Sequence, residues 1–185
     1  MKSTRTFLAL LALLAGMACS TNDAGLGPAT CTGAGCTCSP ENSCACSAGT
    51  DCKTTCSMAG CNLRCDTGAK CNATSAGPTL LTCADSSECK GTGGDASVIS
   101  CLATSKCELK AGASSTATCA VAANCKLHLG PGSTVACNDA SDCDVKCTGD
   151  CAVTCSPVAH CKLECGENGP PGMMCPDGRQ VCGHC

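Results

Sequence analysis

The sequence predicts an all-β fold: a disulfide-rich, β-solenoid-like stack of 18-residue coils, each with two short strands and two turns, and little hydrophobic core. Three observations predict it. The chain has 27 cysteines in 185 residues, a density typical of disulfide scaffolds. Those cysteines recur with the period of one coil. Phe7 is the only aromatic residue, so the chain lacks the large apolar side chains that fill an ordinary core, and covalent bridges must replace them.

Residues 1–18 are predicted to be an export signal. Lys2 and Arg5 precede a short apolar run at residues 7–15, which is too short to span a bilayer and is typical of a signal peptide. Export would deliver the chain to an oxidising compartment, where disulfides persist.

Two ways of processing this signal remain open. Gly16 and Ala18 suit an ordinary signal peptidase, which would leave a periplasmic or secreted protein. The stretch LLAGMACS also resembles a bacterial lipobox, although Gly16 stands where that pattern prefers Leu or Val. Setting Cys19 aside leaves an even number of cysteines, which favours lipidation at Cys19. Ser20 resembles signals for the outer membrane, so we expect an outer-membrane or cell-surface lipoprotein with residues 19–30 as a flexible tether.

The partners that composition excludes are clearer than those it predicts. The formal net charge is −3, and removal of Lys2 and Arg5 makes it more negative. No basic cluster or aromatic platform exists, so nucleic acid is not expected as a partner. The membrane, reached through the lipid, is the one partner predicted; a protein or surface ligand stays unknown.

An 18-residue repeat occupies residues 65–166. Two cysteine columns six residues apart define it, and position five of each unit is always Ala or Ser. The first column is Cys65, Cys83, Cys101, Cys119, Cys137 and Cys155; the second is Cys71, Cys89, Cys107, Cys125, Cys143 and Cys161. Residues 31–64 contain the same residue types at less regular spacing and are predicted to form irregular N-terminal coils. Residues 167–185 are predicted to form a Cys-rich C-terminal cap, which repeat arrays require.

The stretch CDVKCTGDCAVTC at 143–155 indicates the conformation of the unit. Cysteine and valine alternate with polar residues, first around Val145 and again around Val153. A period of two places each trio on one face of a short strand, and the intervening Thr, Gly and Asp disfavour helix. The inward columns are small, which predicts a narrow interior partly made of sulfur.

Pairing within a coil is the predicted disulfide pattern. Six residues leave a turn and return, which can bring two Cα atoms within the range a disulfide allows. Vertical pairing between equivalent cysteines of adjacent coils is the rival, because strand spacing also meets that range. The predicted bridges are Cys65–Cys71, Cys83–Cys89, Cys101–Cys107, Cys119–Cys125, Cys137–Cys143 and Cys155–Cys161, plus Cys147–Cys151 at the other turn of the fifth unit.

Two resemblances follow from these motifs. TCADSSEC (82–89) and TCAVAANC (118–125) resemble the disulfide-closed coils of beetle hyperactive antifreeze β-helices, which implies a related architecture. The ice-binding Thr ladder of that family is not implied, because Ala84 and Ala120 follow the first cysteine here. The whole chain is similar to small Cys-rich repeat lipoproteins of gram-negative soil bacteria, a family that implies no assigned activity.

Two chemical alternatives involve the cysteines. Cys182-Gly-His-Cys185 resembles the redox pair of protein disulfide isomerases, which would imply thiol–disulfide exchange, but no helix is expected to follow Cys185 and lower a thiol pKa. We expect a cap in which Cys165, Cys175, Cys182 and Cys185 form two disulfides instead.

Binding of a soft metal is the second alternative. Cys36-x-Cys38 and Cys44-x-Cys46 resemble metallothionein clusters, and thiolates bind Zn or Cu(I); His184 with the three cysteines after residue 170 could form a Zn site. His128 and His160 are interpreted as solvated turn residues. No hydrolase, phosphate-loop or paired-carboxylate motif is found. The sequence therefore predicts a non-enzymatic structural or binding module with no cofactor and no resident metal.

Overall fold

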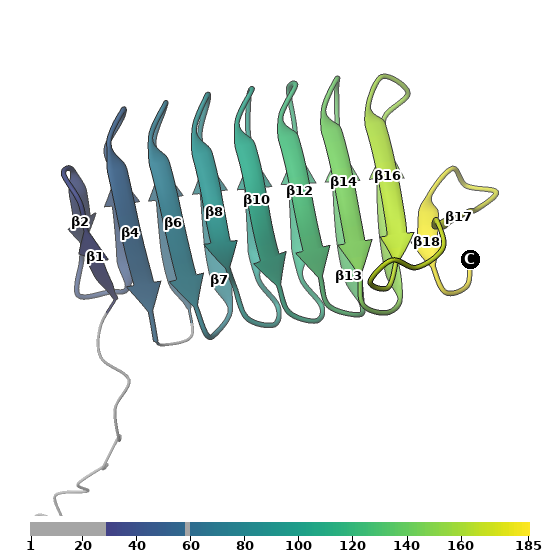
Figure 1. Ribbon diagram of the computed structural model, residues 1–185, viewed down its shortest axis with the longest axis horizontal. Helices are drawn as coiled ribbons and strands as arrows, with labels where there is room; N and C mark the ends of the chain where they lie inside the picture. The colour runs from purple at the N-terminus through teal and green to yellow at the C-terminus, as the bar shows by residue number, and fades with distance from the viewer. Residues whose placement is uncertain (1–28, 58–59) are drawn as a thin grey trace, which may run out of the picture.

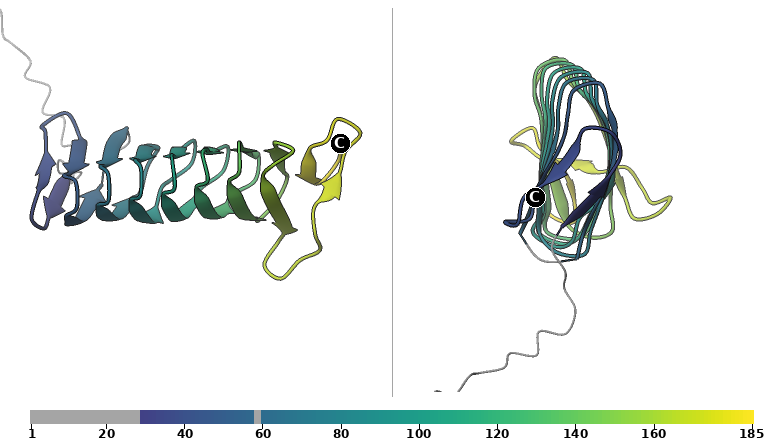
Figure 2. Two further views of the ribbon diagram at one scale, coloured as in Figure 1. Left: turned by 90° about the horizontal axis from the view of Figure 1, so that it is seen from above. Right: turned by 90° about the vertical axis from the view of Figure 1, so that its left-hand side faces the viewer.

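The chain forms an elongated stack of flattened coils, seen from the side in Figure 1 and along its axis in Figure 2. The computed structural model describes residues 29–57 and 60–185. Every regular element in those residues is a β-strand, and one strand on each side of the stack belongs to each coil. The predicted all-β solenoid of two-strand coils is confirmed.

Two sheets make the two broad sides of the stack. Sheet A, in spatial order, contains β1 (Thr30–Thr32), β4 (Asp51–Cys56), β6 (Lys70–Ser75), β8 (Glu88–Thr92), β10 (Lys106–Ala111), β12 (Asn124–Leu129), β14 (Asp142–Cys147) and β16 (His160–Cys165). Sheet B contains β17 (Met173–Met174), β18 (Gln180–Cys182), β15 (Cys151–Cys155), β13 (Ser133–Cys137), β11 (Thr116–Cys119), β9 (Val98–Cys101), β7 (Thr79–Cys83), β5 (Cys61–Cys65), β3 (Ser43–Cys46) and β2 (Cys36–Cys38).

The chain alternates between the sheets and pairs each strand in parallel with the equivalent strand of the next coil. In sheet A, Cys107 is aligned with Cys89 on one side and with Cys125 on the other. The register advances by one repeat unit from each regular coil to the next. Between β4 and β6 it advances by one residue more, with Asp51 opposite Lys70, and it returns to one repeat unit between β5 and β7, with Cys61 opposite Thr79.

The interior has three inward columns on each sheet, because inward and outward residues alternate along every strand. The outer inward columns carry mostly Cys and Ser. The middle columns carry the larger apolar side chains, and these are almost fully buried. They include Leu109, Leu127, Val145 and Leu163 on sheet A and Leu63, Leu81, Ile99, Val135 and Val153 on sheet B. The little hydrophobic core that the chain possesses is therefore concentrated along the centre line of each sheet.

Antiparallel strands cover both ends of the parallel stack. At the N-terminal end, β1 pairs with β4 and β2 pairs with β3 in the antiparallel sense. At the C-terminal end, β18 pairs antiparallel with β15 and β17 with β18, while the backbone of Gly172 donates to Leu163 of β16. An unpaired strand at either end of the stack would be a template for further strands. The antiparallel segments pair with the strands at both ends and so cover them.

None of the described residues forms a helix long and apolar enough to cross a membrane.

Candidate functional site

A line of disulfides runs along one narrow edge of the stack, and each bridge joins sheet B to sheet A. The bridges of the regular coils are Cys65–Cys71, Cys83–Cys89, Cys101–Cys107, Cys119–Cys125, Cys137–Cys143 and Cys155–Cys161. Their Cα–Cα distances are 6.0–6.5 Å. These are the pairs expected from the spacing of the two columns, and each is closed within its own coil rather than between coils. Most of these sulfurs are buried.

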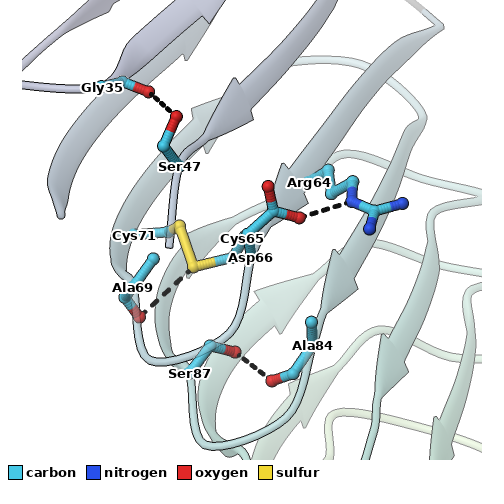
Figure 3. Close-up of polar contacts among 9 residues, drawn as sticks. All are labelled: Gly35, Ser47, Arg64, Cys65, Asp66, Ala69, Cys71, Ala84 and Ser87. Atoms are coloured by element: carbon cyan, nitrogen blue, oxygen red, sulfur yellow. Dashed lines mark hydrogen bonds and ion pairs between the residues drawn. A yellow bond between two sulfur atoms is a disulfide. The ribbon is translucent and has the colours of Figure 1, made fainter. Parts of the chain in front are cut away.

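The turn inside each bridge shows why position five is small. Ala69 is fully buried beneath the Cys65–Cys71 bridge, and its carbonyl oxygen lies 3.5 Å from Sγ of Cys65 (Figure 3). One coil further, Ser87 occupies the same position, and its hydroxyl donates to the carbonyl of Ala84 at 2.6 Å. A larger side chain there would displace the sulfurs, so only Ala or Ser fits under the bridge.

The opposite edge replaces disulfides with a ladder of buried serines. Ser97 donates its backbone N–H to Oγ of Ser115 at 3.2 Å, and Ser115 does the same to Ser133 at 3.1 Å. Each hydroxyl in turn donates to a carbonyl of its own turn, as Ser97 does to Gly94 at 2.7 Å. The ladder therefore satisfies its buried polar groups internally. Where it ends, the Cys147–Cys151 bridge closes the same edge.

The remaining bridges involve both ends of the described chain. At the N-terminal end these are Cys31–Cys36, Cys38–Cys44, Cys46–Cys52 and Cys56–Cys61. Cys46–Cys52 has the spacing of the regular column, so the disulfide edge begins one coil before residue 65. At the C-terminal end, Cys165–Cys182 ties the cap to β16, and Cys175–Cys185 closes the cap itself.

These pairings establish that the cysteines of the CGHC sequence, and those that lie close enough to hold a metal, are oxidised. The cysteines of the CGHC sequence are bonded to different partners, Cys182 to Cys165 and Cys185 to Cys175, and not to each other. Two groups of three sulfurs in the disulfide edge, Cys83/Cys101/Cys107 and Cys101/Cys119/Cys125, have members within 4.8 Å of one another. Since all of them are oxidised, thiolate ligands for a metal would form there only after reduction.

The outer face of sheet A is densely charged. Its outward positions form three columns along the stack. In the middle column, Lys90, Glu108, Lys126, Asp144 and Lys162 are successive neighbours in the strand register. Because basic and acidic residues alternate, each charge lies beside its opposite, an arrangement that stabilises a sheet, whereas like charges in opposing positions destabilise it.

Glu164 is the most strongly perturbed group on this face. Its carboxylate is 2.6 Å from Nζ of Lys162 and 2.9 Å from Nζ of Lys146. Hydrogen bonds from these two ammonium groups lower the pKa of Glu164 to about 2. In the middle of the sheet, Lys90 lies 3.3 Å from Glu108, and that contact raises the lysine pKa.

The outer face of sheet B differs sharply from that of sheet A. From β7 to β15, its outward strand residues are Leu80, Thr82, Val98, Ser100, Thr116, Thr118, Thr134, Ala136, Ala152 and Thr154. None of them is charged. Leu80 and Val98 are adjacent in register and 43% and 44% exposed. The outer face of sheet A is thus charged, whereas that of sheet B carries no outward charge on its strands from β7 to β15. On β5, at the N-terminal side of these strands, Arg64 is exposed.

The difference between the charged outer face of sheet A and the uncharged strands β7 to β15 of sheet B was not among the expectations from the sequence. Reading every second residue outward from the cysteine columns would have separated the two sets. His128 and His160, interpreted as turn residues, lie instead on β12 and β16 with their side chains exposed. Cys19, the predicted lipidation site, lies outside the described residues.

Comparisons of this chain with protein-family models, with curated proteins and with solved structures find no match.

Proposed function

We propose that this protein is an exported, lipid-anchored structural module of the cell envelope, with no catalytic activity of its own. The single observation that carries the proposal is the oxidation state: within the described residues, every cysteine is in a disulfide. Such extensive bridging is typical of exported proteins, because reducing compartments keep thiols free. A stack with a disulfide in every coil suits a part that must hold its shape in an oxidising compartment.

The anchor part of the proposal concerns residues before the stack. Cys19 is the one cysteine left over from the thirteen bridges of the described residues, and the sequence around it resembles a lipobox. Residues 20–28 would then connect the lipid to Ala29, giving a tether of up to about 30 Å when fully extended. The module would stand close to the membrane surface without inserting into it.

Fractionation tests this proposal. Protein made in a gram-negative host through its own signal should sediment with membranes and carry a lipid mass on Cys19. Replacing Cys19 with Ala should release the protein or block its processing, whereas Ser20→Ala, a neighbouring change that keeps the cysteine, should leave it membrane-bound. Soluble wild-type protein that retains an unmodified Cys19 would show that the anchor is wrong.

A thiol count tests the structural part separately. Under denaturing, non-reducing conditions, the processed protein should show no thiol that reacts with a maleimide. The redox alternative requires free thiols, which the maleimide count would detect. The metal alternative requires bound ions that leave only on acidification, which mass spectrometry of the native protein would detect.

A further inference from the structure

One column of sheet A departs from the alternation of charge described above. In the outward column nearest the serine edge, Lys110, His128 and Lys146 follow one another in register on β10, β12 and β14. Neighbouring strands are about 4.8 Å apart, so three basic side chains lie side by side over about 10 Å. The two lysines carry the same charge on either side of the histidine, and nothing in the packing of the coils requires them here.

These basic residues have few partners. Among the described residues, Lys110 and His128 form no ion pair, and both side chains are exposed. Lys146 contacts Glu164 at 2.9 Å, but Glu164 also contacts a second lysine. The positive charge of this run is therefore only partly neutralised by the protein.

A groove lies along the same run. Its volume is about 560 Å³, and Lys110, His128 and Lys146 are among the residues that line it. Ala113 and Pro131, which carry no charge, also line it. The volume is within the range of small-molecule sites, about 300–1,000 Å³.

Acidic residues bound the groove at its two ends. Asp95 lies one coil before Ala113, whose backbone N–H it accepts at 2.7 Å, and Glu167 lies beyond Lys146 towards the C-terminal cap. A long polyanion would have to pass these carboxylates and would be repelled there. A short anion that covers only the three middle coils would avoid both.

The backbone beneath the run keeps the groove open. Gly130 also lines the groove, and a Cβ atom added there would approach the backbone nitrogen of Ala113 at 2.5 Å. Glycine therefore allows the turns of adjacent coils to pack closely and adds no side chain to the groove.

We propose that this groove binds a small molecule with two or three carboxylate or phosphate groups, placed so that its anionic groups meet Lys110, His128 and Lys146. The interaction offsets the repulsion between the two lysines. The site does not depend on the lipid anchor, so either proposal can fail without the other.

The test uses the full-length oxidised protein, isotopically labelled for NMR, and two trivalent probes, tripolyphosphate and tricarballylate. Both should produce saturable shifts in the amides of residues 110–113, 128–131 and 146–148. Inorganic phosphate and acetate, which carry one anionic group, should bind at least about tenfold more weakly, because they can meet only one base at a time. A preference between the two trivalent probes will distinguish phosphate from carboxylate chemistry.

Variants then locate the site. Lys110→Ala and His128→Ala should each weaken binding about three- to fivefold, the scale of losing one exposed ion pair, and the double variant about tenfold or more. Lys126→Ala is the matched control, because it removes an exposed charge from the same strand as His128 but from the alternating column. It should change affinity less than about twofold.

Three results would overturn the proposal: no saturable shift with either trivalent probe up to about 10 mM, the range of very weak binding; equal losses for Lys110→Ala and Lys126→Ala, which would show diffuse attraction to sheet A; or shifts that map to another part of the stack.

Discussion

Replacing Leu127 with Ala tests how much of the stability comes from the narrow apolar interior rather than from the disulfides. Leu127 is fully buried at the centre of β12, between Leu109 and Val145 of the adjacent coils. The equivalent inward position on the preceding sheet-B strand is Ala117, which offers only a methyl group to fill a cavity. The Cys119–Cys125 bridge also limits how far the coil can collapse.

Buried Leu→Ala changes cost about 2–5 kcal/mol, with the largest losses where the surroundings cannot relax. We therefore expect Leu127→Ala to lower the free energy of unfolding by about 3–5 kcal/mol. Leu80→Ala is the matched control, since it removes the same atoms from a side chain that is 43% exposed. It should cost less than about 1 kcal/mol.

Guanidinium unfolding of the oxidised proteins, followed by circular dichroism, measures both changes. Because repeat proteins can unfold in parts, hydrogen exchange of the amides in β10, β12 and β14 should accompany it and show faster exchange in Leu127→Ala. Equal shifts of the two midpoints would refute the reasoning, because they would mean that the disulfides hold the coils whether or not the interior is filled.

Three further perturbations address other parts of the stack. The carboxyl group of Glu164 should titrate by NMR with a pKa of about 2 instead of its ordinary 4.5, because two lysines donate to it. The stability it contributes is therefore present above pH 4.5 and lost as the pH falls through 2, and Glu164→Gln should remove that acid dependence. Val121 has a left-handed backbone with φ of 53° and an exposed side chain, so Val121→Asn should raise the unfolding free energy by about 1 kcal/mol; a loss would show that the turn is not strained. Replacing both Cys165 and Cys182 with Ala opens a loop with a sequence separation of 17 and should cost about 3 kcal/mol, against about 2 for one bridge across a six-residue separation. The second double variant replaces both Cys119 and Cys125 with Ala, and thermal unfolding compares the two. A smaller loss of stability at the cap would contradict the loop-entropy estimate.

The coil and its register could be predicted because cysteine marks the same inward positions in every repeat. Sulfur at both ends of the C-x5-C segment requires a reversal of the chain, and the alternation around Val145 and Val153 requires strands. Both requirements are local, so they can be read from one unit and checked against the next.

The centre line of sheet A was harder to predict from the sequence. Its inward position is Ala73 in one coil, Gly91 in the next and Leu109 in the third, so size varies while the direction of the side chain stays constant. A column that tolerates such differences has no clear sequence signature.

The C-terminal cap depends on long-range pairing. Four cysteines allow three ways of forming two bridges, and no repeat identifies the correct one. The antiparallel pairing of β18 with β15 brings Cys182 towards Cys165. This pairing occurs only at the end of the stack, so no repeated pattern in the sequence predicts it. The basic column was missed for a related reason: Lys110, His128 and Lys146 are each one full repeat apart in the sequence, and each is unremarkable within its own coil.

Bridges confined to single coils also affect how such a gene can change its length. If one repeat unit is lost or duplicated in register between Cys83 and Cys143, every remaining C-x5-C pair is complete and no cysteine is left without a partner. Vertical bridges would have left orphan thiols at each such event. Recombination between repeats can therefore lengthen or shorten the stack one strand spacing at a time, without requiring a new pairing scheme for oxidative folding.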